Sequence, residues 1–235
     1  MIAKSVSLRV KQGLAVVIMA IAMLPATLWA GTLKDNFSGN MSRWDLANAP
    51  SGSWELKNGE LIITPHNYPV GFFIGETTWK DYTIGVSAKI VKSQPSGSIE
   101  GAVIGVRATS LIDGYVFGFG TLGDGNKYVF CFRADGNIVV TIAVFKPFEW
   151  ELDRWYDLKL DAEGNTFKFY VNNELFIEYT DKVYSAGKMN ISASFSTTTA
   201  HFDDFSVTGN DIPDTLASVS QKGKIAIAWG KLKGK

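Results

Sequence analysis

The amino-acid sequence predicts an all-β domain, built as an antiparallel sandwich of two sheets. Between residues 35 and 208, short runs of apolar and β-branched residues are separated by clusters of Gly, Asn, Asp and Pro. These runs recur at roughly the 8–12-residue spacing that is typical of sandwiches and barrels. Helical periodicity is almost absent from the same region. Turn dipeptides between the runs complete the argument for two packed sheets.

Alternation along the runs justifies their assignment as strands. Tyr82, Ile84 and Val86 fall on one face of an extended chain, whereas Thr83 and Gly85 fall on the other, because side chains alternate with a period of two. We expect about a dozen strands. In chain order, the runs are residues 54–56, 60–64, 72–74, 82–91, 102–108, 115–119, 127–133, 138–145, 156–161, 166–171, 175–180, 188–194 and 200–208.

Three dipeptides between these runs predict tight hairpins. Asp135-Gly136, Asn58-Gly59 and Asn172-Asn173 each separate two strand-like segments. Type I′ turns need positive φ at both central residues, which Asn, Asp and Gly adopt at the lowest cost. Adjacent strands at these three places are therefore expected to pair antiparallel.

The first thirty residues predict a secretory signal peptide. Residues 1–12 carry three basic residues and no acid, residues 13–24 are apolar, and Pro25 ends the apolar run. This order, with a small residue at Ala30, is typical of a cleavable signal. Leu28 is bulkier than the usual residue at its position, so an uncleaved N-terminal anchor remains an alternative. The apolar run is, however, shorter than the ~20 residues that span a bilayer.

The balanced charge of the chain hides three unequal parts. The whole chain has 23 Lys and Arg against 23 Asp and Glu. The signal, residues 1–30, carries 3 basic residues, and the C-terminal residues 210–235 carry 5 basic and 2 acidic residues. The domain between them, residues 31–209, keeps 15 basic and 21 acidic residues, a net charge of −6. Such a domain fits cations and neutral sugars better than nucleic acid.

Residues 210–235 are interpreted as a basic linker and C-terminal tail. The tail contains the short apolar segment 224–229, which ends in Trp229. Trp229 could dock on the domain, bind a protein partner or belong to a terminal strand, and we favour the strand. Cys131 is the only cysteine, so no intrachain disulfide can form. Its place in an alternating run indicates a small buried apolar side chain rather than a nucleophile.

Three stretches of the chain carry a family resemblance. The first comprises residues 35–39, Trp44, 54–56 and 58–62; the second, residues 101–107 and 114–117; the third, residues 154–159, 164–174, 179–181 and 201–207. They resemble concanavalin A-like jelly-roll domains, in particular the 3-keto-disaccharide hydrolase, laminin-G-like and glycoside hydrolase family 16 groups. The resemblance spans residues 35–209 and implies a jelly-roll fold. It implies much less about activity, since one sandwich hosts lectins, hydrolases and adhesion modules.

The sequence shows no recognisable pair of catalytic carboxylates. A retaining glycosidase of the resembling type places its acids at alternate positions of one strand, about 5–5.5 Å apart. Residues 149–153 have that spacing of acids but precede a strand, and a solvated loop explains them better. Glu100, Glu76 and Asp113 could act from different strands. Whether the protein is an enzyme is therefore left open, with glycoside hydrolysis as the reaction class if it is one.

Candidate glycan-binding residues are Arg107, Tyr115, Trp150 and Arg133. A glycan groove needs aromatic platforms for sugar C–H faces and polar side chains that fix orientation. Arg107 and Arg133 end strands, Tyr115 lies on the strand between them, and Trp150 lies in a loop. The resemblance places the positions of Arg107 and Tyr115 on the concave sheet of the family.

The resemblance also implies a structural Ca²⁺ where the N-terminal segment meets the last strand. Asp35 and the pair Asp203-Asp204 occupy those stretches, and carboxylates are the hard ligands that Ca²⁺ prefers. The alternative is that these acids cap or solvate strand edges.

Three classes of function follow from these observations. The favoured hypothesis is a secreted, periplasmic or extracellular lectin-like module that binds a glycan on the concave sheet. The first alternative is a glycoside hydrolase, or a 3-keto-glycoside hydrolase or lyase, of the same fold. The second is an extracellular structural or adhesion module that binds protein through the tail. Nucleic acid is not an expected partner, and the mature chain has no expected transmembrane segment.

Overall fold

The computed structural model of the protein is an all-β sandwich. It describes residues 30–47, 52–66, 68–94, 98–136, 140–194 and 198–213. These residues form fifteen strands and no helix, so the described chain holds no helical span that could cross a membrane. The predicted signal peptide, except Ala30, and the predicted tail beyond Pro213 lie outside the described residues.

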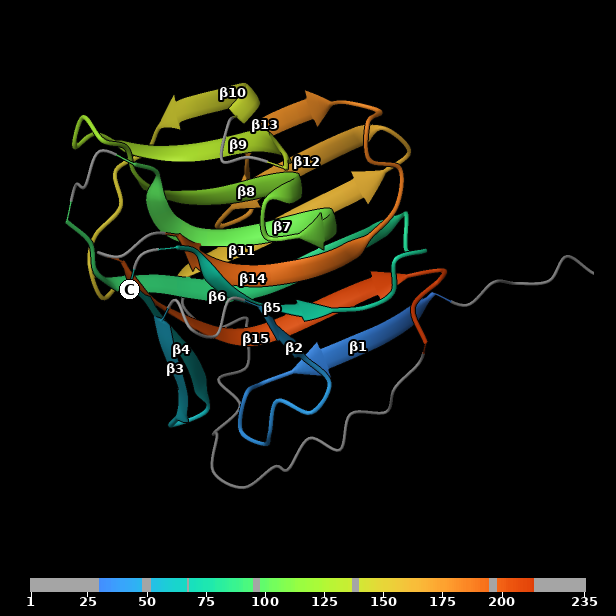
Figure 1. The fold of residues 1–235 in the computed structure, drawn as a ribbon, viewed down its shortest axis with the longest axis horizontal. Helices are drawn as coiled ribbons and strands as arrows, with labels where there is room; N and C mark the ends of the chain where they lie inside the picture. Colours follow the sequence, from blue (N-terminus) through green and yellow to red (C-terminus); the bar gives the residue numbers. More distant parts are fainter. Residues whose placement is uncertain are drawn as a thin grey trace, which may run out of the picture.

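One layer of the sandwich, called sheet A, has eight strands in the order β13-β12-β11-β6-β15-β4-β3, with β1 paired to β15. Its strands are β1 (Gly31–Asp35), β3 (Gly52–Lys57), β4 (Glu60–Pro65), β6 (Tyr82–Lys92), β11 (Tyr156–Glu163), β12 (Thr166–Val171), β13 (Glu174–Thr180) and β15 (Thr199–Gly209). Figure 1 shows this layer packed face to face with the second sheet.

The second layer, called sheet B, has seven strands in the order β10-β9-β8-β7-β14-β5-β2. Its strands are β2 (Asp45–Ala47), β5 (Val70–Ile74), β7 (Glu100–Ser110), β8 (Asp113–Thr121), β9 (Lys127–Asp135), β10 (Val140–Pro147) and β14 (Lys188–Ser194). Every strand pair in both sheets is antiparallel. The predicted two-sheet antiparallel sandwich is confirmed.

Twelve of the thirteen predicted runs lie within strands, and the described part of the run 138–145 lies within β10. Two strands were not predicted. β1 pairs with β15 and β2 pairs with β5. Both are short, five and three residues, and neither has enough length to show alternation. They form strands because β15 and β5 lie beside them, and only the tertiary arrangement supplies these partners.

The core fills the space between the sheets with the alternating positions. Tyr82, Ile84 and Val86 are all buried, as predicted, and so are Ala88 and Ile90. Phenylalanine rings of the two sheets meet there: Phe117 of β8 lies 5.7 Å from Phe169 of β12, centroid to centroid. Edge and tilted ring contacts of this kind add to the free energy of simple burial.

Cys131 belongs to the same core. Its side chain is buried, and burial raises the pKa of its thiol to about 12. A thiol that stays protonated at neutral pH is a poor nucleophile. The interpretation of Cys131 as a small buried apolar residue is confirmed.

Two of the predicted hairpin turns have the expected backbone. Asn58 and Gly59 have φ values of 56° and 76°, and Asn172 and Asn173 have φ values of 51° and 66°. Positive φ at both positions defines type I′ geometry. At the third predicted turn, Gly136 has φ 69°, but Asp135 does not have positive φ and ends β9. The predicted type I′ turn at this pair is therefore wrong, and the residues that follow, 137–139, lie outside the described residues.

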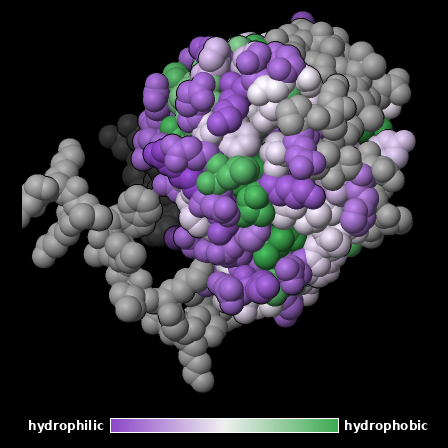
Figure 2. Space-filling view, turned by 90° about the vertical axis from the view of Figure 1, so that its left-hand side faces the viewer, coloured by the Kyte–Doolittle hydropathy of each residue, from purple (hydrophilic) through white to green (hydrophobic). Residues whose placement is uncertain are grey.

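The surface at one end of the sandwich is mostly polar. Figure 2 shows hydrophilic residues over most of this end, with apolar residues confined to small patches. Single exposed apolar side chains are normal on soluble proteins. The polarity of this end of the surface therefore does not by itself mark a binding site.

Candidate functional site

Arg107 lies inside the sandwich rather than on its surface. Its side chain is 1% exposed, and its guanidinium donates to the carbonyl oxygens of Gly164 (2.6 Å), Lys80 (3.1 Å) and Tyr184 (3.2 Å). It also stands 4.9 Å from the centre of the Phe167 ring. These carbonyls come from three different connections between strands, so Arg107 ties those connections together.

The backbone explains why alternation misplaces Arg107. Arg107 has φ 47°, and the register of β7 against β8 shifts between Val106 and Ser110. Such a bulge re-aims the side chains that follow it. An Arg that alternation places on the outward face is thereby directed into the interior.

Tyr115 and Arg133 converge on Asp181 at the same end of the sandwich. The Tyr115 hydroxyl donates to Asp181 Oδ1 at 2.8 Å, and Arg133 donates to Asp181 Oδ2. Arg133 also donates to both carboxylate oxygens of Asp135, and Tyr184 donates to Asp135 Oδ1 at 3.0 Å. We call Arg107, Tyr115, Arg133, Asp135, Asp181 and Tyr184 the end network.

The pKa values of the end network follow from burial and from these bonds. Burial raises the pKa of Tyr115 to about 12, although the Tyr184 N–H bonded to its oxygen opposes the shift. Burial also acts to raise the pKa of Asp181. Hydrogen bonds from the Val183 N–H, Tyr115 and Arg133, with the charge of Arg133, outweigh it and hold that pKa below its ordinary value. The network is thus a neutral tyrosine and an ionised carboxylate held by an arginine.

Trp150 is buried as well. Its side chain is 3% exposed, and its indole N–H donates to the Gly120 carbonyl at 3.0 Å. It packs edge-on against Phe119, with 6.0 Å between ring centres. Trp150 therefore closes the core beneath the loop that carries it.

The four residues predicted to bind a glycan are engaged within the fold. Arg107, Tyr115 and Trp150 each donate a hydrogen bond to a partner inside the sandwich, and Arg133 is held by two carboxylates. These contacts join elements of the fold.

The candidate acids are dispersed. Residues 149–153 form a loop before β11, as expected. Glu100 is completely buried at the start of β7, Glu76 is exposed, and Asp113 accepts a hydrogen bond from Ser110. Within the described ranges, no three His, Cys, Asp or Glu side chains form a group able to hold a metal ion.

Asp35, Asp203 and Asp204 do not fit a Ca²⁺ site. The predicted meeting of the N-terminal segment with the last strand is present, since Asp35 pairs with Phe205. The Asp35 carboxylate, however, accepts hydrogen bonds from the Phe37 N–H (2.9 Å), Trp44 Nε1 (2.9 Å) and Arg43 (3.1 Å).

A cation would have to displace these donors and face the Arg43 charge. On β15, a bulge leaves Asp204 exposed with φ 50°, and Asp203 accepts from its N–H. Asp35 thus caps the end of β1, whereas Asp203 and Asp204 lie at a bulge in the middle of β15.

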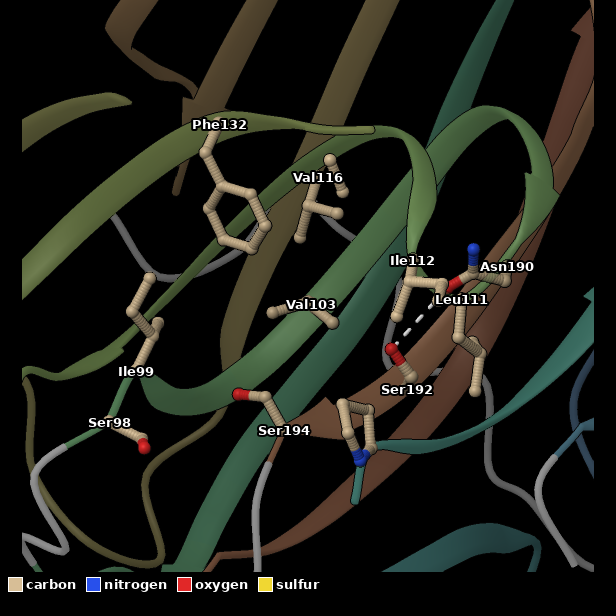
Figure 3. A pocket seen from close by; sticks show the side chains of 12 residues that line it. Ser98, Ile99, Val103, Leu111, Ile112, Val116, Phe132, Asn190, Ser192 and Ser194 are labelled. Atoms are coloured by element: carbon tan, nitrogen blue, oxygen red, sulfur yellow. Dashed lines mark hydrogen bonds between the residues drawn. The ribbon is translucent and has the colours of Figure 1, made fainter. Parts of the chain in front are cut away.

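A hollow with a volume of about 270 Å³ lies on the outward face of sheet B. Val103, Val116 and Phe132 form its apolar floor across three neighbouring strands, β7, β8 and β9 (Figure 3). Their chain neighbours, such as Ile104 and Phe117, belong to the core, so these three side chains point away from it. Ile99 stands at one end of the hollow (Figure 3).

A row of small polar side chains borders the hollow along β14. Asn190, Ser192 and Ser194 alternate with core residues and line the hollow. Ser192 Oγ donates to Asn190 Oδ1 at 3.4 Å, the dashed line in Figure 3, and Ser194 Oγ donates to the Gly101 carbonyl at 3.3 Å. The amide nitrogen of Asn190 then supplies donors, and the two hydroxyl oxygens supply acceptors.

Glycines make room for this arrangement. A Cβ at Gly105 would lie 2.1 Å from Asn190 Nδ2, and one at Gly118 would lie 2.8 Å from a Val103 methyl carbon. Any larger residue at either place would push these side chains out of position. The space of the hollow thus depends on the absence of side chains at Gly105 of β7 and Gly118 of β8.

This site was not predicted from the sequence. Residues 188–194 were predicted as a strand, and Asn190, Ser192 and Ser194 alternate there with Met189, Ile191 and Ala193. That signal marks three outward polar residues. It does not tell which strands lie beside them, and the β7 and β8 neighbours form the apolar floor.

Several known structures are similar in fold to this chain. A carbohydrate-binding module, CBM66 from Bacillus subtilis, superposes with TM-score 0.54 at 20% identity, over 71% of this chain and 95% of that one. The VIP36 exoplasmic/lumenal domain in its Ca²⁺/Man3GlcNAc-bound form gives TM-score 0.54 at 13% identity, over 78% and 90%. A β-1,3-1,4-glucanase (lichenase) derived from a mouse hindgut metagenome gives 0.53 at 12%, over 77% and 100%.

The chain has the two-sheet jelly-roll fold of these structures. No family model and no curated protein matches its sequence. At these identities the likeness establishes the jelly-roll fold alone, and a binding module and a glucanase share it. Function must be argued from the hollow.

Proposed function

We propose that this jelly roll is a non-catalytic module that binds a glycan in the hollow of sheet B. The observation that carries the proposal is the composition of the hollow. An apolar floor of Val103, Val116 and Phe132 lies beside the polar row of β14. Sugars present apolar C–H faces and hydroxyl rims, which need these two kinds of surface together.

The chemistry of the hollow favours binding over hydrolysis. None of the side chains that line it is acidic, basic or a thiol. Glycoside hydrolysis by the usual route needs two carboxyl groups that flank the scissile bond. Similar structures that carry the words carbohydrate binding or carbohydrate recognition in their descriptions support the proposal at the level of the fold.

The proposal includes export from the cytoplasm. The basic start, apolar run and small residue at Ala30 support a cleaved signal. β1 begins at Gly31, so cleavage after Ala30 would leave the whole strand in the mature domain. N-terminal sequencing of the exported protein should begin at Gly31. Recovery of a membrane-bound chain that begins at Met1 would favour the uncleaved anchor.

The binding test uses the purified full chain on immobilised polysaccharides and a broad glycan array. Val116 is half-buried on the outward face, so Val116→Trp should fill the hollow without entering the core. We expect at least a tenfold loss of retention. The matched control is Val91→Trp, at a half-buried outward position of β6 in sheet A, which should keep normal retention.

Two results would contradict the proposal. Retention that survives Val116→Trp would place the glycan site elsewhere. Release of reducing sugar that is abolished by changing one acid would make the protein a hydrolase. Thermal unfolding of both tryptophan variants checks that a loss of binding is not a loss of fold.

A further inference from the structure

One side of the hollow is apolar and the opposite side is polar, and this difference limits which ligands can fill it. In Figure 3, Phe132 and Val116 face Ser192 and Ser194 across Val103, and the turn residues Leu111 and Ile112 close one end. The hydrogen-bonding side chains on β14 thus share one edge. A ligand that fills the hollow must have an apolar side opposite a polar one.

An ordinary hexose can lay a C–H face on the floor of the hollow, but its ring carries hydroxyls on nearly every corner. One of these hydroxyls would face the apolar side formed by Val116 and Phe132, opposite the β14 row (Figure 3). A hydroxyl that loses water without gaining a hydrogen bond costs enough free energy to weaken binding about tenfold. The lining also holds no charged side chain, so a buried uronate or sulfate would lack a counter-charge.

We infer that the hollow selects a neutral deoxy sugar, whose methyl group packs on Val116 and Phe132 while its hydroxyls meet the β14 row. This inference rests on the proposed glycan binding and specifies its ligand class. Asn190 donates to a ring hydroxyl, and Ser192 and Ser194 accept from others. A methyl group at this corner adds apolar burial where a hydroxymethyl would bring an unpaired oxygen.

The experiment compares sugar pairs that differ by one hydroxyl. Methyl α-L-rhamnoside is paired with methyl α-L-mannoside, and methyl α-L-fucoside with methyl α-L-galactoside. Each is titrated into the full chain while the side-chain amide signal of Asn190 is followed by NMR. We expect at least one deoxy sugar to bind about tenfold tighter than its partner. Its methyl protons should receive the strongest saturation transfer from the protein.

Variants locate the selectivity. Val116→Thr puts a hydroxyl into the apolar wall at nearly constant volume, and it should bring the affinity ratio of the preferred pair close to one. Val91→Thr makes the same change on sheet A and should leave the ratio unchanged. Both positions are half-buried and outward, so both variants are expected to fold.

The outcomes separate the inference from the function on which it rests. Equal or tighter binding of the hydroxylated sugar overturns the deoxy-sugar inference and leaves glycan binding in place. Binding of 1-hexanol as tight as the best sugar also overturns it, because the polar row would then contribute nothing. If no sugar shifts the Asn190 signal while polysaccharides are retained, the inference is wrong for this hollow. If nothing is retained either, the proposed function fails as well.

Discussion

The end network and the hollow are two polar regions of one sandwich with opposite designs. In the end network, long charged and aromatic side chains point inward, and each meets a partner: Arg107 meets three carbonyls, and Asp181 meets Tyr115 and Arg133. In the hollow, short side chains point outward and leave a volume of about 270 Å³ between them.

The difference teaches that residue type alone does not identify a binding surface. Arg, Tyr and Trp are the side chains that sugar sites favour, and here their hydrogen bonds hold loops and sheets together. Small and aliphatic residues, which attract no attention in a sequence, line the hollow. We therefore propose that the end network stabilises the fold and that the hollow binds the ligand, and each variant below tests that division.

The largest expected effect is that of Arg107→Ala. It removes the buried guanidinium that donates to the carbonyls of Lys80, Tyr184 and Gly164. Hydrogen bonds that involve a charged group contribute about 1.5–3 kcal/mol each, so we expect the free energy of unfolding to fall by about 3 kcal/mol or more. Chemical denaturation measures it. A stable Arg107→Ala protein that has lost glycan binding would reverse the assignment of Arg107.

Asp181→Asn should have the next largest effect, about 2 kcal/mol, because charge-assisted hydrogen bonds from Arg133 and Tyr115 are lost. The pKa of Asp181 is lowered in the fold. Its stabilising contribution is therefore present above the unfolded pKa and is lost as pH falls through the folded pKa.

The wild type should lose stability on acidification below about pH 4, and the Asn variant should lose less over the same range. Unfolding curves between pH 6 and pH 2.5 give both slopes. Parallel slopes would mean that Asp181 does not carry this share of the acid sensitivity.

Asn190→Ala tests the other region. It removes one neutral hydrogen-bonding group from the hollow, which is expected to reduce glycan affinity about fivefold. Because the hydrogen bond that Asn190 accepts from Ser192 is long, 3.4 Å, the free energy of unfolding should change by less than about 0.5 kcal/mol. Asn165→Ala, at an exposed turn position, serves as the control. A large loss of stability with unchanged affinity would move Asn190 from the binding region to the structural one.

The smallest expected effect is that of chelation. Since Asp35 is already bonded to Arg43 and Trp44, EDTA should leave the Tm unchanged, and added Ca²⁺ should not raise it. A ligand that binds only the native state must raise the Tm. A clear increase in Tm with Ca²⁺ would show a cation site and would make the carboxylates near β1 candidate ligands again.

Much of the fold could be predicted because strand formation leaves local marks. Alternation along residues 82–91 and the Asn58-Gly59 turn depend on period and on φ preference, both of which are written into short windows. β1 and β2 escaped, since their pairing with β15 and β5 has no local signal. The residues of the hollow differ from those predicted from the sequence to bind a glycan, because their grouping depends on which strands lie side by side.

The chain alone determined the all-β class, the register of the hairpins and the identity of the core faces, because these depend on neighbours within a few residues. Tertiary structure decided which strands lie side by side and where a bulge turns a side chain. Only the order β9-β8-β7-β14 brings Phe132, Val116 and Val103 beside the polar row of β14. Only the shifted register after Val106 turns Arg107 inward, because the direction of a side chain depends on backbone geometry that partner strands impose.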